Sequence, residues 1–278
     1  MASEIENPLI SQLTGNAPVR LLREVEIRKK GDSPTIAMLD LWHSLCQEKL
    51  GTPIEVVMGN RRDCKQLRSI RGEVNIAYPR FVEGKMVLVL WLESPKDANP
   101  IVITHEIGHW VLKLQGMRTY QYKPRPDGWI ERHLNSSAQH PHLYELQRSL
   151  GHEPRAEIDS RAEHDVHRFS NEREPRGRDA WIENALLLAD DILNCSEVYK
   201  KRLKSVVKRK HRNTAEILNK ILEIAPYYSP PSPKGDYRSF RRPIQKRLIS
   251  ELQLGAGWRE LNEVKDLKLM IEEAAAGR

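Results

Sequence analysis

The feature that most constrains the fold is one apolar run, PIVITHEIGHWVLKLQ at residues 100–115, with two histidines and a glutamate near its middle. Asn99 is a good N-cap, Pro100 suits the first helical turn, and Gly116 suits the end of a helix. The sequence therefore predicts a helix over 100–115. Because the run is apolar on most of its faces, we expect this helix to be largely buried.

Strands and one further helix are predicted before this segment. Ser33 is predicted as the N-cap and Pro34 as a first-turn residue of a helix that ends near Gly51. Three strand-like runs follow, PIEVVM (53–58), EVNIAYP (73–79) and KMVLVLWLE (85–93), with turn residues at Gly59-Asn60 and Glu83-Gly84. The third run is almost continuously apolar, as a strand covered on both faces would be.

The chain after Gly128 is predicted to be helical. The expected helices span 129–139, 141–150, 155–169, 179–194, 197–210, 214–225, 240–253 and 258–275, with Pro141 starting the second of them. The clearest linker is YYSPPSPKGD at 227–236. The fold class is therefore α+β: a small mixed β-sheet packed on the helix at 100–115, followed by a mostly α-helical C-terminal half.

The composition indicates a cytoplasmic protein without a membrane partner. The longest uninterrupted apolar run, Met86 to Leu92, is too short to cross a bilayer, and the N-terminus lacks a basic segment typical of a secretory signal. Cys46, Cys64 and Cys195 are scattered, which is typical of free thiols in a reducing compartment.

His105, Glu106 and His109 form the pattern His-Glu-x-x-His inside the predicted helix. Residues four apart lie on one face of a helix, so both imidazoles can reach one metal ion. The carboxylate next to the first ligand can then act as general base for the water that the metal activates. The alternative is a buried helix whose three polar side chains are satisfied by protein groups, which costs a few kcal/mol wherever a partner is missing.

At this point the sequence resembles the zincin metallopeptidases. The order of a helix, three strands and the helix with ITHEIGHWVL is similar to members of the ImmA/IrrE type, over residues 33–150. The resemblance implies a zinc metallopeptidase domain at 33–150, preceded by an irregular segment at 1–32. The helical, basic region at 151–278 lies outside the resemblance.

A catalytic zinc ion normally has three protein ligands, and the His-Glu-x-x-His pattern identifies only two of them. The resemblance favours Glu131, because a glutamate on the next helix often fills this role, with Asn135 as its partner one turn further on. His140 is the main alternative, and Glu145, Glu157, Asp159 and Glu163 remain as others. His164 and His167 lie beside an apolar stripe and are expected to face solvent.

The charge is unevenly distributed along the chain. Residues 196–247 contain fifteen Lys or Arg against four Asp or Glu, whereas the whole chain has a net charge of +7. The basic stretch at 200–212 could bind nucleic acid through phosphates, or it could be the solvated face of a helix whose inner side is Val198, Leu203, Val206 and Val207.

The sequence therefore predicts a Zn²⁺-dependent peptidase that hydrolyses a peptide bond of an intracellular protein or peptide substrate. His105, His109 and Glu131 would hold the metal and Glu106 would be the general base. Tyr120, Tyr122 and His133 are candidates for stabilising the oxyanion. The alternative is a zincin-like regulatory or nucleic-acid-binding protein with a structural or vestigial metal site.

Overall fold

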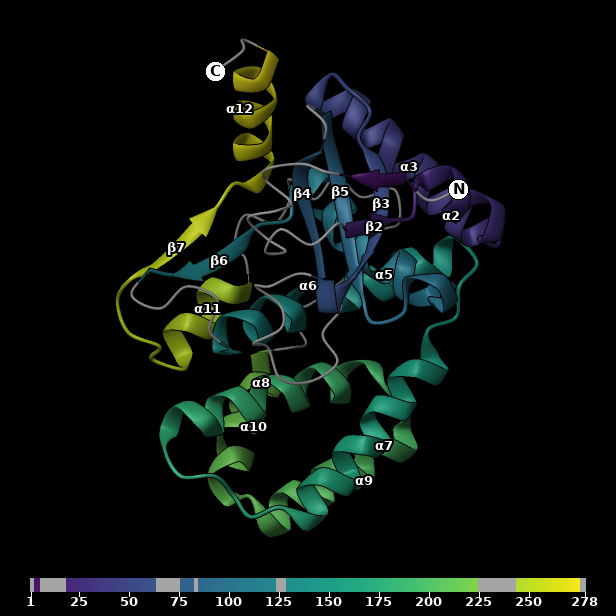
Figure 1. The fold of residues 1–278 in the computed structure, drawn as a ribbon. Coiled ribbons are helices and arrows are strands. Elements are labelled where there is room, and N and C mark those ends of the chain that lie inside the picture. Colours follow the sequence, from purple (N-terminus) through teal and green to yellow (C-terminus); the bar gives the residue numbers. More distant parts are fainter. Residues whose placement is uncertain are drawn as a thin grey trace. The chain divides into compact units, whose positions relative to one another are not determined.

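The computed structural model describes residues 3–5, 19–63, 76–82, 85–123, 129–224 and 244–275. The chain divides into two compact units. The first comprises residues 1–115, 149–152 and 263–278, and the second comprises residues 116–148 and 153–262. The first contains a small mixed sheet with helices, and the second is mostly helical (Figure 1), which confirms the predicted α+β class.

The first unit is built around a three-stranded sheet. Its elements are β1 (Ser3–Ile5), β2 (Val19–Leu21), α2 (Glu24–Lys30), α3 (Ser33–Leu50), β3 (Glu55–Asn60), β4 (Ile76–Val82), β5 (Lys85–Leu92), α5 (Pro100–Leu114) and α12 (Glu263–Ala275), with short 3₁₀ turns at Arg61–Asp63 and Pro95–Asp97. β5 lies in the centre, parallel to β3 and antiparallel to β4. The sheet is therefore mixed, as predicted.

Both faces of β5 are covered, as its apolar sequence predicts. Every residue from Met86 to Leu92 is buried. Val87, Val89 and Trp91 join Leu21 and Val57 in one apolar cluster. The helix α5 packs against β4 and β5.

Two predictions in this unit need correction. Gly59, predicted as a turn residue, lies inside β3, where a Cβ would come within 2.6 Å of the Trp91 ring. Glycine is therefore needed at this position for close packing. Residues 1–32, predicted as irregular, include β1, β2 and α2. Leu22 also pairs with Met58 through two backbone hydrogen bonds of 2.8 and 2.9 Å.

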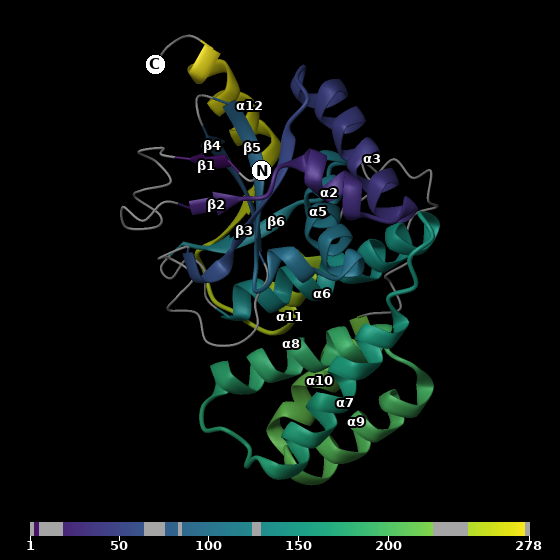
Figure 2. The same cartoon turned by 45° about the vertical axis from the view of Figure 1, so that its right-hand side comes forward.

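The second unit contains β6 (Thr119–Tyr122), α6 (Trp129–Ser149), α7 (Arg155–Asn171), α8 (Arg178–Asn194), α9 (Glu197–Lys210), α10 (Arg212–Ile224), α11 (Ile244–Glu251) and β7 (Trp258–Leu261). The helices α7, α8, α9 and α10 pack together (Figure 2) around buried side chains that include Phe169, Leu186 and Leu203. The prediction of a helical C-terminal half is confirmed.

The predicted helix break at Pro141 is wrong, because α6 continues through this proline. Pro141 has no N–H to donate to the carbonyl four residues earlier, which costs about 3 kcal/mol in a helix interior. Leu134, Ala138 and Leu143 are buried on both sides of the proline. Their burial offsets the lost hydrogen bond and keeps the helix continuous.

The predicted helix at 258–275 is also divided. Residues 258–261 form β7, which pairs antiparallel with β6, and α12 begins only at Glu263. Neither strand could be predicted from its own sequence, because each is stabilised by pairing with a strand far away in the sequence. The predicted linker at 227–236, the turn at Glu83-Gly84 and Cys64 lie outside the described residues. Cys46 and Cys195 are buried free thiols.

Candidate metal centre

The helix α5 is fixed at its start and along its length by hydrogen bonds. The Asn99 side chain accepts a hydrogen bond of 2.9 Å from the backbone N–H of Ile101, as an N-cap does. The indole N–H of Trp110 donates to the carbonyl of Ala77 in β4 over 2.9 Å. These contacts, with Pro100 in the first turn, confirm the predicted start of this buried helix.

A chain of three side chains connects α5 with α3. The Nδ1 atom of His152 lies 2.9 Å from the Thr104 hydroxyl, and its Nε2 atom lies 2.9 Å from an Asp32 carboxylate oxygen. Asp32, and not the predicted Ser33, caps α3 by accepting a hydrogen bond of 3.0 Å from the Thr35 N–H. Because Thr104 directly precedes His105, this chain helps to hold the first of the two paired histidines in place.

His105 and His109 lie one turn apart on α5, and their rings converge. Their Nε2 atoms are 3.3 Å apart, and the ring planes are nearly perpendicular at 86°. Both side chains are partly accessible, whereas most of the helix around them is buried. The predicted pair is therefore formed as the spacing requires.

Glu106 is buried beside this pair, with 9% of its surface exposed. Burial raises the pKa of Glu106 to about 8, and the positive charge of Lys113 opposes this rise. Lys113 itself contacts Glu263 over 2.8 Å and lies 3.9 Å above the centre of the Trp110 ring. The carboxyl group can thus exchange a proton near neutral pH.

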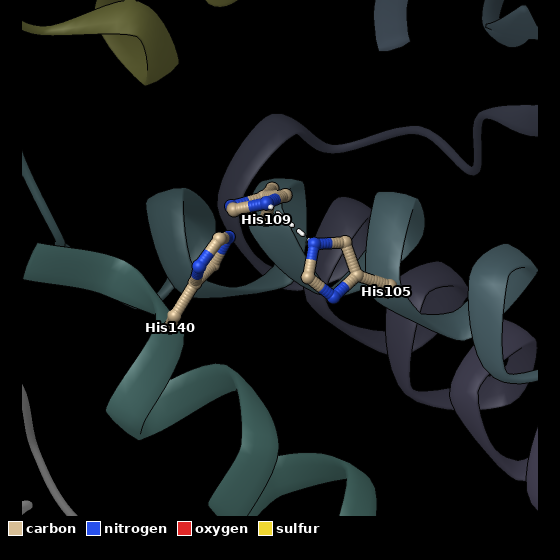
Figure 3. Close-up of side chains that lie close together, drawn as sticks. All are labelled: His105, His109 and His140. Carbon is tan, nitrogen blue, oxygen red and sulfur yellow. Dashed lines mark hydrogen bonds between the residues drawn. The ribbon is translucent and has the colours of Figure 1, made fainter. Parts of the chain in front are cut away.

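His140 lies inside α6 and completes a group of three imidazoles. One ligand atom from each of His105, His109 and His140 lies within 4.8 Å of the other two, and Figure 3 shows the three rings turned toward one another. This is the single group of at least three metal-ligating side chains among the residues that the structure describes. The three histidines could hold a metal ion, and imidazole ligands suit zinc, copper, iron or nickel.

A buried carboxylate from α8 fixes the ring of His140. The Nδ1 atom of His140 lies 2.6 Å from Asp190, and both side chains are less than 10% exposed. The same Asp190 oxygen accepts a hydrogen bond of 3.2 Å from Arg161, and its other oxygen accepts one of 3.0 Å from Asn194. Although burial alone would raise it, His140 and Arg161 hold the pKa of Asp190 below its usual range. The carboxylate therefore stays charged.

Glu131, predicted as the third ligand, is not part of the group of three. It lies in the first turn of α6, and its carboxylate accepts a hydrogen bond of 2.9 Å from the backbone N–H of Tyr122. Asn135, one turn further on, contacts the backbone N–H and carbonyl of Tyr120, each over 2.8 Å. Both side chains hold the strand β6 against α6.

The remaining candidate ligands lie elsewhere. Asp159 accepts a hydrogen bond of 2.7 Å from the backbone of Ser196, and Glu145 pairs with Arg148 over 2.9 Å. Glu157 is partly exposed. Glu163, His164 and His167 are exposed on α7, which confirms the predicted solvated face.

The three candidates for stabilising an oxyanion differ in their surroundings. Tyr120 is buried, and its hydroxyl donates to Glu260 over 2.8 Å. The Tyr122 ring contacts Trp258 with 5.3 Å between ring centres. Burial lowers the pKa of His133 to about 4, so this imidazole is neutral at neutral pH. A neutral imidazole can still donate one hydrogen bond.

Comparisons with protein-family models, with curated proteins and with solved structures find no match for this chain. Within the described parts of the chain, no helix combines the length and the apolar character that a membrane span needs.

Proposed function

We propose that this chain is a zinc-dependent peptidase of the zincin type. The observation that carries the proposal is the arrangement on α5, where two imidazoles converge at 3.3 Å beside a buried carboxyl group. Two nitrogens that each lie about 2.0–2.1 Å from a tetrahedral zinc ion are about 3.3 Å apart. The spacing of His105 and His109 fits such an ion.

We assign the third ligand to His140 in place of Glu131. The His140 ring lies with the other two histidines, and Asp190 contacts its Nδ1 atom, so Nε2 would be the ligand atom. Three imidazoles leave a fourth position open, as catalytic zinc sites require. The Glu131 carboxylate, by contrast, accepts a hydrogen bond from the backbone of β6.

The reaction assigned to this site is hydrolysis of a peptide bond. Zinc bound by His105, His109 and His140 would supply a Lewis acid for the scissile carbonyl and for the attacking water. Glu106 takes a proton from the attacking water and passes it to the nitrogen of the leaving amine. The carboxylate form of Glu106 accepts the proton and the resulting carboxylic acid returns it, so one side chain serves both transfers.

This proposal is tested with the full chain loaded with zinc and a peptide library prepared from digested cell protein, with new termini counted by mass spectrometry. Glu106→Gln keeps the shape of the side chain but removes the base, so turnover should fall by about 10²-fold or more. Glu145→Gln is the matched control, because Glu145 pairs with Arg148 on α6. Turnover that survives Glu106→Gln in protein that retains its metal would overturn the mechanism.

A second candidate function, nucleic-acid binding, is favoured by the surface of α9. Leu203, Val206 and Val207 are buried, but Val198, predicted on the same inner side, is 64% exposed in the first turn. The outward residues Lys201, Arg202, Lys204, Lys208, Arg209 and Lys210 are all exposed. Glu197 is the one acidic residue of α9, and its carboxylate pairs with Lys200 over 2.7 Å. Such a cationic face is suited to phosphate groups.

A further inference from the structure

We propose that Asp190 is a positioning residue of the metal centre, which selects the His140 tautomer whose Nε2 atom binds the ion. This inference rests on the proposed function only in requiring that His140 is a metal ligand. It gives the helical region after residue 150 a direct role in the centre, because Asp190 lies on α8, fifty residues after His140.

The contact with His140 has the geometry that this role needs. The distance of 2.6 Å between His140 Nδ1 and an Asp190 oxygen is short for a nitrogen–oxygen hydrogen bond, as expected when the acceptor is charged. An ionised carboxylate can only accept, so this contact selects the tautomer with its proton on Nδ1. The lone pair of a neutral imidazole is then on Nε2, and histidine ligands are commonly oriented by this kind of hydrogen bond.

Asp190 is itself held in place by hydrogen bonds from two other side chains. Arg161 from α7 donates to the same oxygen that contacts His140, and Asn194 donates to the other oxygen. Arg161 also donates to Asp191 and lies 3.2 Å from the Tyr144 hydroxyl. The carboxylate thus has one well-determined orientation, and it passes that orientation to the imidazole.

A buried charged cluster of this kind is a costly way to stabilise a helical core. Asp190 is 5% exposed, and the helices around it are already packed through apolar residues such as Leu186 and Leu188. Replacing a buried ion pair by apolar residues of similar volume is often neutral or stabilising. The cluster is therefore better explained by what it does for His140 than by what it adds to stability.

The first test measures zinc affinity by competition with a chelator in the full chain. Asp190→Asn keeps the volume, but its amide can donate a hydrogen bond to Nδ1 and so favour the tautomer protonated on Nε2. Zinc binding should therefore weaken by about 10- to 100-fold. Asp159→Asn is the matched control, because Asp159 lies in the same unit and accepts a hydrogen bond from the backbone of Ser196. Unchanged zinc affinity in Asp190→Asn, with wild-type protein binding zinc, would overturn the inference and leave the proposed function standing.

A second measurement does not depend on how the variant folds. Long-range ¹H–¹⁵N spectra of metal-free wild-type protein should show the His140 proton on Nδ1. A proton on Nε2 in wild type would overturn the role of Asp190. If the wild type carries the Nδ1 proton but binds no zinc, the proposed function fails instead. The cobalt-substituted protein adds a spectroscopic check, because the tetrahedral visible bands should change in Asp190→Asn and stay unchanged in Asp159→Asn.

Discussion

At the scale of single residues, Glu24 shows how this chain keeps a buried charge. Its carboxylate accepts hydrogen bonds from Arg28 over 2.7 Å and from the backbone N–H of Val56 over 3.0 Å, and it lies 2.8 Å from His43. Burial alone would raise the pKa of Glu24, but the bonds from His43, Val56 and Arg28 outweigh it and lower the pKa below 4.5. The charged form therefore stabilises the folded first unit.

The sign of this shift predicts sensitivity to acid. Since the folded pKa lies below the unfolded one, the stabilisation is fully present above about pH 4.5 and is lost as the pH falls through the lower, folded value. Glu24→Gln should reduce the free energy of unfolding by about 2 kcal/mol at neutral pH and flatten the acid limb of the stability curve. Urea unfolding between pH 7 and pH 3 measures both effects.

The control for this prediction is Glu48→Gln, since Glu48 is an exposed partner of Lys49 and should contribute little. If the free energy of unfolding falls equally steeply toward pH 3 in wild type and in Glu24→Gln, the role assigned to Glu24 is wrong.

The candidate site could be predicted only in part at this scale. The pair His105 and His109, with Glu106 between them, follows from helical spacing, which is a local property. The third position could not be derived in this way, because Glu131 and His140 both follow at plausible distances in sequence. The short hydrogen bond between His140 and Asp190 joins residues that are fifty positions apart in the sequence. No local sequence pattern therefore predicts it.

At the scale of elements, local signals placed most helices, whereas elements that depend on distant partners were missed. Asn99 and Pro100 define the start of α5 correctly. The strands β6 and β7 pair over more than a hundred residues, and without this pairing each is too short to be recognised. Pro141 misled the prediction because a proline ends a helix only when burial on either side does not offset its cost.

The helix α9 carries the prediction that belongs to this scale. Lys201→Glu, Lys204→Glu and Lys208→Glu together reverse the charge of one exposed face. If this face contacts phosphates, the triple variant loses three contacts with a random DNA duplex. Each contact contributes about 0.9 to the slope of log affinity against log salt, so the magnitude of this negative slope should decrease by about 3. Fluorescence anisotropy at several salt concentrations measures the slope.

Lys85→Glu, Lys96→Glu and Lys268→Glu make the matched control, since they change the net charge equally at exposed lysines outside α9. Equal losses in the two triple variants would show that the overall charge, and not α9, determines the affinity. Cleavage of a small peptide should be the same in both.

At the scale of the whole molecule, the α+β class followed from the order of the predicted elements. The division into units did not, because the segments 149–152 and 263–278 belong with the N-terminal unit through contacts that the sequence order hides. The helix α12, for example, contacts α3 and α5. The charge is equally uneven over the molecule, since residues 196–247 are strongly basic and the remainder of the chain is net acidic.

The central claim is that His105, His109 and His140 together hold one zinc ion, and metal analysis of the purified chain tests it most directly. After dialysis against metal-free buffer, wild-type protein should retain about one zinc ion per chain, as a site with three protein ligands does. His105→Ala, His109→Ala and His140→Ala should each lose it, whereas Glu131→Ala should keep it. Full zinc content in His140→Ala together with its loss in Glu131→Ala would contradict the account and return the third ligand to Glu131.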